Sequence, residues 1–162
     1  MIDYEIMIIL DPNKYDYNNS INYYTNIIND FNGIILNIEN LGLKKLSYNI
    51  NKLYNGIYII FNINILKLNI VKLKNKFSID NNIIRNLIIK KKINKNTKTL
   101  YNMIDYKNVF FLKKFLTENF KILPRKITKL KYKLQKRLSK QIKISRYMSL
   151  LPYTDNHYLL KT

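Results

Sequence analysis

The stretch Gly56–Ile63, with the sequence GIYIIFNI, is a strong β-strand signal. Its β-branched and aromatic residues favour an extended backbone, and Gly56 marks the point where the strand opens. Upstream, Ile34, Leu36 and Ile38 recur at every second position, which is the period of a strand. A long hairpin region separates the two stretches. The pattern therefore predicts two consecutive strands in the middle of a sheet domain.

Working outward from this pair, each side carries a helix and then a further strand. The helical positions are Ile21, Tyr24, Ile28 and Phe31 on one side and Leu66, Ile70, Leu73 and Phe77 on the other. The first strand along the chain is Tyr4–Leu10, which ends at Asp11-Pro12, and the last is Ile83–Ile89. The order β-α-β-β-α-β predicts an α+β, ferredoxin-like split βαβ domain, with a four-stranded antiparallel sheet and both helices on one face. That fold supports many functions, so function must come from other features.

The charge of the chain is concentrated in its second half. The 162 residues carry a formal net charge of +19. Residues 1–89 hold 9 Lys+Arg and 7 Asp+Glu, whereas residues 90–162 hold 20 Lys+Arg and 3 Asp+Glu. A charge of this size requires a polyanionic partner such as nucleic acid or an anionic membrane. The asymmetry predicts two units with different roles.

The second half begins with a polar stretch, Lys90–Met103, that lacks steady periodicity and reads as a linker or arm. A short helix is expected after Asp105, and a longer one over about Leu130–Tyr147. The long helix has apolar residues at i+4 steps, namely Leu130, Leu134, Leu138 and Ile142. The predicted organisation is a sheet domain at 1–92, a linker at 93–103 and a small basic all-α unit at 104–162. The core of this second unit is thin for its size.

Cations surround the narrow apolar stripe of the long helix. They are Lys129, Lys131, Lys133, Lys136, Arg137, Lys140, Lys143 and Arg146. A solvated charged face normally has mixed signs and i,i+4 ion pairs. Here no acidic residue lies between Glu118 and Asp155. The imbalance favours polyanion binding over a merely solvated surface.

Other chemistries find little support. Three glycines are too few for a phosphate-binding loop, and the absence of cysteine excludes disulfides and thiolate zinc sites. His157 is the single histidine, so neither a metal site nor a cofactor is predicted. Tyr48 and Tyr58 are candidates for base stacking, although a role as core or surface filler suits these tyrosines better. The longest apolar run, Ile57–Phe61, is far too short to span a bilayer.

The first unit resembles the family of ribosomal small-subunit protein six over nearly all of residues 1–92. The opening YEIMIILDP, the segment Gly33–Asn40 and the stretch LGLKKLSYNINKLYNGIYIIFNI (Leu41–Ile63) follow the family order. The places of its Trp-Gly-Arg-Arg-x-Leu-Ala-Tyr-x-Ile-x-Lys pattern are occupied here by Leu41, Gly42, Lys44, Lys45, Leu46, Ser47, Tyr48, Ile50 and Lys52. Leucine stands in place of the family's tryptophan, and lysine in place of its arginines. Arg85 also has a family counterpart.

The second unit resembles ribosomal small-subunit protein eighteen from about Ile104 onward. The segments LKKFLTENFKILPRKIT (Leu112–Thr128) and RYMSLLPYTDNH (Arg146–His157) keep the family spacing. Two family glycines are replaced by Phe120 and Lys129, so the turns there are expected to adopt another conformation.

Together the resemblances imply a non-enzymatic component of the small ribosomal subunit in which two usually separate proteins are joined end to end. The separate family members form a dimer on the central domain, or platform, of small-subunit rRNA. The implied partners are this RNA and neighbouring small-subunit ribosomal proteins, in the cytoplasm or the equivalent compartment of an organelle. No membrane, cofactor or small-molecule substrate is implied.

The same resemblance implies phosphate contacts at Arg125, Lys126, Arg137 and Arg146, with Lys44 and Lys45 as weaker candidates. The unbalanced charge of the long helix adds Lys131, Lys133, Lys136, Lys140 and Lys143 as candidates. The alternative function is a general RNA- or DNA-binding protein that does not reside in the ribosome. A membrane-surface helix over Leu130–Tyr147 is a third possibility, and an enzyme of the ferredoxin-like fold is the least favoured.

Overall fold

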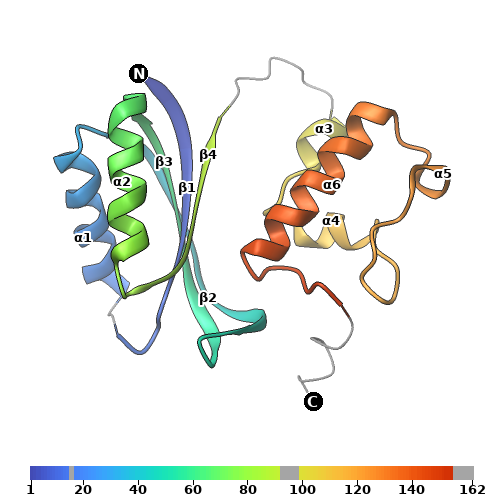
Figure 1. Ribbon diagram of the computed structural model, residues 1–162, viewed down its shortest axis with the longest axis horizontal. Coiled ribbons are helices and arrows are strands. Elements are labelled where there is room, and N and C mark those ends of the chain that lie inside the picture. The colour runs from blue at the N-terminus through green and yellow to red at the C-terminus, as the bar shows by residue number, and fades with distance from the viewer. Residues whose placement is uncertain (15–16, 92–98, 155–162) are drawn as a thin grey trace. The chain divides into compact units, whose positions relative to one another are not determined.

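The computed structural model describes residues 1–14, 17–91 and 99–154 (Figure 1). The chain forms two compact units, Met1–Ile93 and Asn94–Thr162, which are described separately below. Part of the predicted linker, 93–98, lies outside the described residues, as does His157. The rest of that linker is helical rather than irregular, because Thr99–Met103 forms the short helix α3.

The first unit has the predicted α+β fold. Its elements are β1 (Ile2–Leu10), α1 (Tyr17–Asp30), β2 (Ile34–Ile50), β3 (Leu53–Ile65), α2 (Lys67–Ile79) and β4 (Ile83–Lys90). The strands are arranged in the order β2-β3-β1-β4, and each neighbouring pair is antiparallel. The predicted β-α-β-β-α-β order and ferredoxin-like class are therefore confirmed.

Both helices cover one face of the sheet (Figure 1), and the core lies between them and the strands. Alternation in β3 turns Ile57, Ile59 and Phe61 to this side, where they are buried with Leu73 and Phe77 of α2. Each such side chain contributes roughly 1.5–3 kcal/mol by leaving water. These contacts between β3 and α2 form the centre of the first unit's core.

Two positions in the β2–β3 hairpin have special backbone requirements. Asn51 and Lys52 form its two-residue turn, and both have positive φ, at 51° and 64°. Such a turn usually carries glycine at the second position. Gly56 lies where β3 passes close to β1, since a Cβ there would be 2.6 Å from Cγ2 of Ile9. The glycine is thus needed for strand packing.

The second unit is helical. It contains α3 (Thr99–Met103), α4 (Val109–Lys113), α5 (Arg125–Thr128) and α6 (Tyr132–Tyr147). The core consists of Ile104, Leu112, Leu138, Ile142 and Leu151, with Leu130 and Leu134 packed partly buried against it. The predicted long helix is confirmed, but it begins at Tyr132, because Lys131 is in an extended conformation at its N-cap.

The turns at Phe120 and Lys129 contradict the expectation from sequence. Both residues have positive φ, 56° and 54°, so they keep the left-handed conformation that suits glycine. At Lys129 this conformation caps α5, and its backbone N–H donates to the Arg125 carbonyl at 3.0 Å. The prediction that these turns adopt another conformation is therefore wrong. Both turns hold a non-glycine residue in the left-handed region, at a cost in backbone strain.

Candidate nucleic-acid interface

Helix α6 separates an apolar face from a cationic one. Leu138 and Ile142 are fully buried in the core of the second unit, one helical turn apart. The opposite face carries Lys136, Lys140 and Lys143, all of them exposed. The 3.6-residue period therefore lines up the lysines along one side of α6.

This cationic face is hollowed. A groove of about 630 Å³ is lined by Arg125, Tyr132, Gln135, Lys136, Ser139, Lys140 and Lys143. A second hollow, of about 320 Å³, is lined by Arg125, Lys126, Lys129 and Leu130. Arg125 lines both, so the two hollows adjoin at its side chain.

The walls of the groove are held by hydrogen bonds. Gln135 accepts from the Thr128 hydroxyl at 2.7 Å and donates to the Leu123 carbonyl at 2.9 Å. These two bonds fasten α5 and the segment before it to α6. The Arg125 Nε donates to the Leu130 carbonyl at 3.1 Å, which orients its guanidinium at the junction. The planar guanidinium of arginine matches the geometry of a phosphate group.

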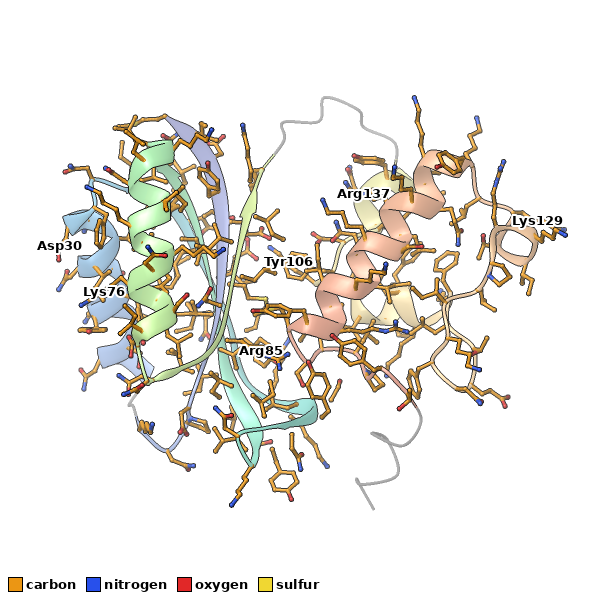
Figure 2. The ribbon with its side chains drawn as sticks, in the orientation of Figure 1. Asp30, Lys76, Arg85, Tyr106, Lys129 and Arg137 are labelled. Atoms are coloured by element: carbon orange, nitrogen blue, oxygen red, sulfur yellow. The ribbon has the colours of Figure 1, made fainter. Side chains whose placement is uncertain are left out.

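Electrostatics of the groove strongly favour an anion. The segment from Lys121 to Thr154 contains no carboxylate side chain, so the groove lysines have no acidic neighbour in sequence. Like charges in this arrangement repel one another. Lys129 projects outward from the loop before α6 (Figure 2) and adds to the same field. A polyanion placed here would neutralise several of these charges at once.

Two of the predicted arginines have a part in the packing of the unit itself. The Arg137 Nε donates to the Ile104 carbonyl at 3.1 Å, and its guanidinium lies 3.9 Å from the ring centroid of Tyr101 (Figure 2). Arg146 donates to the Phe120 carbonyl, and burial lowers its pKa. Both side chains therefore tie α6 to earlier segments of the unit.

The remaining predicted residues fall into separate groups. Lys126 is exposed and lines the second hollow, whereas Lys131 and Lys133 are exposed near the start of α6 but line neither hollow. Lys44 and Lys45 are exposed on β2 of the first unit. The structure thus gathers five of the predicted cations, Arg125, Lys126, Lys136, Lys140 and Lys143, around the two hollows.

Sequence reasoning missed the neutral lining residues. Tyr132, Gln135 and Ser139 share the lysine face of α6 because they follow i, i+3, i+7 spacing. That spacing is visible in the sequence, but the charge pattern does not distinguish these three residues from other polar ones. Lys129 was noticed as a cation of the helix, yet its place in the second hollow depends on the α5 cap.

The tyrosines considered for base stacking are engaged in the first unit. Arg85 donates to the Tyr48 hydroxyl and lies 5.4 Å from the centroid of its ring. Tyr58 is buried, and this burial, with the neighbouring Tyr48, raises its pKa above the ordinary value. These contacts agree with the interpretation of both residues as packing groups.

Other kinds of site find no support in the part of the chain that the structure describes. Within residues 1–14, 17–91 and 99–154, no three His, Cys, Asp or Glu side chains gather as a metal site would require. Across the same ranges, no helix has the length and apolar character needed to cross a bilayer. The basic groove is therefore the feature on which a functional interpretation rests.

Comparison with known proteins gives two family matches in one chain. The family model for ribosomal protein S6 matches residues 3–90, and the model for ribosomal protein S18 matches residues 100–151. Among solved structures, the 30S ribosomal protein S6 of Thermotoga maritima is 23% identical, with a TM-score of 0.48. That match covers 56% of this chain and 87% of the other. The two family matches follow one another along the chain.

Proposed function

This chain belongs to the ribosomal protein S6 family and continues into a ribosomal protein S18 segment, and we propose that it binds the platform of the small ribosomal subunit as a covalently joined equivalent of a two-protein dimer. Both families consist of small-subunit ribosomal proteins, so the chain is a small-subunit ribosomal protein. Its role is therefore structural and not enzymatic. Its partners are accordingly small-subunit rRNA and ribosomal proteins. The proposal adds the central domain of that RNA as the binding site.

The observation that carries the proposal is the separation of charge between the units. Residues 1–89, which form nearly all of the well-packed first unit, hold 9 Lys+Arg against 7 Asp+Glu, whereas the second unit exposes lysines along a preformed groove. In this division the sheet domain serves as a scaffold and α6 holds RNA phosphates. Phosphate contacts position a protein without reading sequence, so selectivity for one site comes from the folded shape of the RNA.

The covalent link has a physical consequence for assembly. A short tether keeps the second unit at an effective concentration of roughly millimolar near the first, if it spans the gap. Both units would then reach the RNA in equal number and in one event. The intact mass of this protein, taken from purified small subunits, tests the link: one polypeptide supports it, whereas two separate fragments contradict it.

The site is tested by charge reversal at Lys136 together with Lys140. Both are exposed and line the groove, so the double change to Glu should release the chain from small-subunit particles during sedimentation. Losing about two phosphate contacts also makes the negative slope of log K against log salt shallower by roughly 1.4–1.8. Arg137 is less suitable, because its contacts with Ile104 and Tyr101 also stabilise the unit.

A matched control is available on α2. Lys72 and Lys76 have the same i,i+4 spacing and are also exposed, but lie in the first unit. Changing both to Glu alters the net charge equally, and particle occupancy should then stay near that of the unchanged chain. Equal loss from both variants would mean that net charge, and not the groove, drives binding. Such a result would favour the general nucleic-acid-binding alternative.

A membrane-surface role for α6 is less consistent with its packing. Leu138 and Ile142, the centre of its apolar stripe, are fully buried in the core of the second unit. An interfacial helix needs that face free to enter the headgroup region. In flotation with anionic liposomes at about 150 mM salt, the chain should therefore stay at the bottom of the gradient and not rise with the lipid. At this salt concentration the Debye length is about 8 Å, so charge attraction by itself is weak.

A further inference from the structure

We propose that the groove on α6 holds an unpaired stretch of RNA, with one base stacked on Tyr132 and the adjoining backbone along Lys136, Lys140 and Lys143. This inference rests on the proposed function, because it takes RNA as the partner of the groove. It adds the kind of RNA, single-stranded rather than duplex, and one aromatic contact. The groove that contains all four residues is the observation behind it.

Tyr132 presents its ring to solvent at the start of the groove. It is the first residue of α6, and its side chain is 65% exposed. Within the described part of the chain its ring stacks on no other ring and its hydroxyl has no hydrogen-bond partner. Aromatic side chains in basic grooves bind single strands because every base offers a π-face. The ring is thus free to accept one base.

The lysines continue along the helix from this ring. Lys136, Lys140 and Lys143 follow Tyr132 at spacings of 4, 4 and 3 residues. With a rise of about 1.5 Å per residue, they extend over roughly 16 Å of the helix axis from the ring. A backbone that lies along this line meets successive positive charges, while the base next to its start reaches the aromatic face.

The groove is preorganised for such a strand. Gln135 lines it and is fixed by its bonds to Thr128 and Leu123. Arg125 is oriented by its hydrogen bond to the Leu130 carbonyl and lines the second hollow as well as the groove. Because these contacts exist before RNA arrives, less ordering is needed on binding. Ser139, which also lines the groove, offers a hydroxyl for the ribose 2′-OH.

Duplex RNA fits this arrangement poorly. In an A-form helix the bases are paired and stacked on one another, so between its two ends no base face is presented to a side chain outside. The phosphates of a duplex can still contact the lysines. A duplex should therefore use the charges but not the ring, and this difference separates stacking from simple charge attraction.

The test measures binding of the full chain by fluorescence anisotropy to three probes: a 12-mer of oligouridine, an abasic 12-mer with the same phosphates, and a 12-base-pair RNA duplex. Tyr132→Ala should weaken oligouridine binding by about 5- to 150-fold. Binding of the abasic strand and of the duplex should change by less than about twofold. Tyr132→Trp should retain oligouridine binding, because stacking needs the ring and not the hydroxyl.

The matched control is Tyr54→Ala. Tyr54 is 58% exposed, a fraction similar to the 65% of Tyr132, but it lies on β3 of the first unit. The oligouridine affinity of this variant should be unchanged. An unchanged oligouridine affinity for Tyr132→Ala would overturn the stacking proposal, as would an equal loss on the abasic strand. If that variant still sediments with small subunits, the proposed function stands and stacking alone fails. Absence of the unchanged chain from small subunits would instead refute the proposed function.

Discussion

Replacing Lys129 with glycine should stabilise the second unit. Lys129 has φ 54° and ψ 15° and caps α5 with its backbone N–H, while its side chain is exposed. In the left-handed region, the Cβ of an L-residue crowds the following carbonyl, at a cost of roughly 1–2 kcal/mol. Glycine avoids that crowding but loses more backbone entropy on folding, about 0.5–1 kcal/mol. The net gain should be about 0.5–1 kcal/mol.

Calorimetry of the full chain measures this gain. In a domain of this size, 1 kcal/mol moves the melting temperature by about 4–8 °C, so a rise of roughly 2–8 °C is expected. Amide hydrogen exchange of α6 peptides assigns the change to the second unit. Lys129→Ala is the essential control, because it removes the same charge and keeps the Cβ. Lys72→Gly, within α2, should instead cost about 1 kcal/mol, because glycine weakens a helix interior.

The Lys129→Gly and Lys129→Ala variants should weaken RNA binding equally. Each removes one cation from the second hollow, which makes the negative slope of log K against log salt shallower by about 0.7–0.9. Stability and binding then change in opposite directions for the glycine variant. If Lys129→Gly proved no more stable than Lys129→Ala, backbone strain at this cap would be refuted as a destabilising factor.

Three further changes test the first unit. Lys52→Gly should raise thermal stability by about 0.5–1 kcal/mol, because the turn formed with Asn51 has positive φ at both residues; an unchanged melting temperature would contradict this. Gly56→Ala should destabilise by roughly 1–3 kcal/mol in urea titrations, since the new Cβ would be 2.6 Å from Cγ2 of Ile9; wild-type stability would mean that the strands separate at little cost. Burial raises the pKa of Tyr58 in the fold, so its contribution is present below the unfolded pKa near 10 and lost as pH rises above it. Tyr58→Phe should therefore flatten the fall in urea midpoint between pH 9 and pH 11, and an equal slope in both proteins would refute the assignment.

The sheet domain could be predicted because its sequence signals are local and consistent with one another. Alternation in GIYIIFNI places Ile57, Ile59 and Phe61 on one face, and those residues are buried beneath the helices. The i+4 steps of Leu134, Leu138 and Ile142 likewise predict the buried face of α6, and with it the direction of the lysines. The periodicity of apolar residues was therefore sufficient to predict which face of β3 and of α6 is buried.

The features that sequence could not predict depend on contacts between distant segments. Arg137 and Lys136 are neighbours of similar charge, yet the turn of about 100° per residue directs one toward Tyr101 and Ile104 and the other into the groove. Phe120 lies in a local turn, where its backbone N–H donates to the Thr117 carbonyl at 2.9 Å, but the guanidinium that donates to its own carbonyl comes from Arg146 on α6. No local pattern at Phe120 or Arg137 specifies these partners.

These observations connect binding with folding in the second unit. Its core is small, residues such as Phe120 and Lys129 hold strained backbone conformations, and its lysines repel one another. All three effects lower the stability of the unit when RNA is absent. A polyanion in the groove relieves the repulsion and binds the folded form, so it stabilises the unit by mass action. Lysine at the α5 cap illustrates the balance, because its side chain costs folding free energy and supplies a charge that RNA uses.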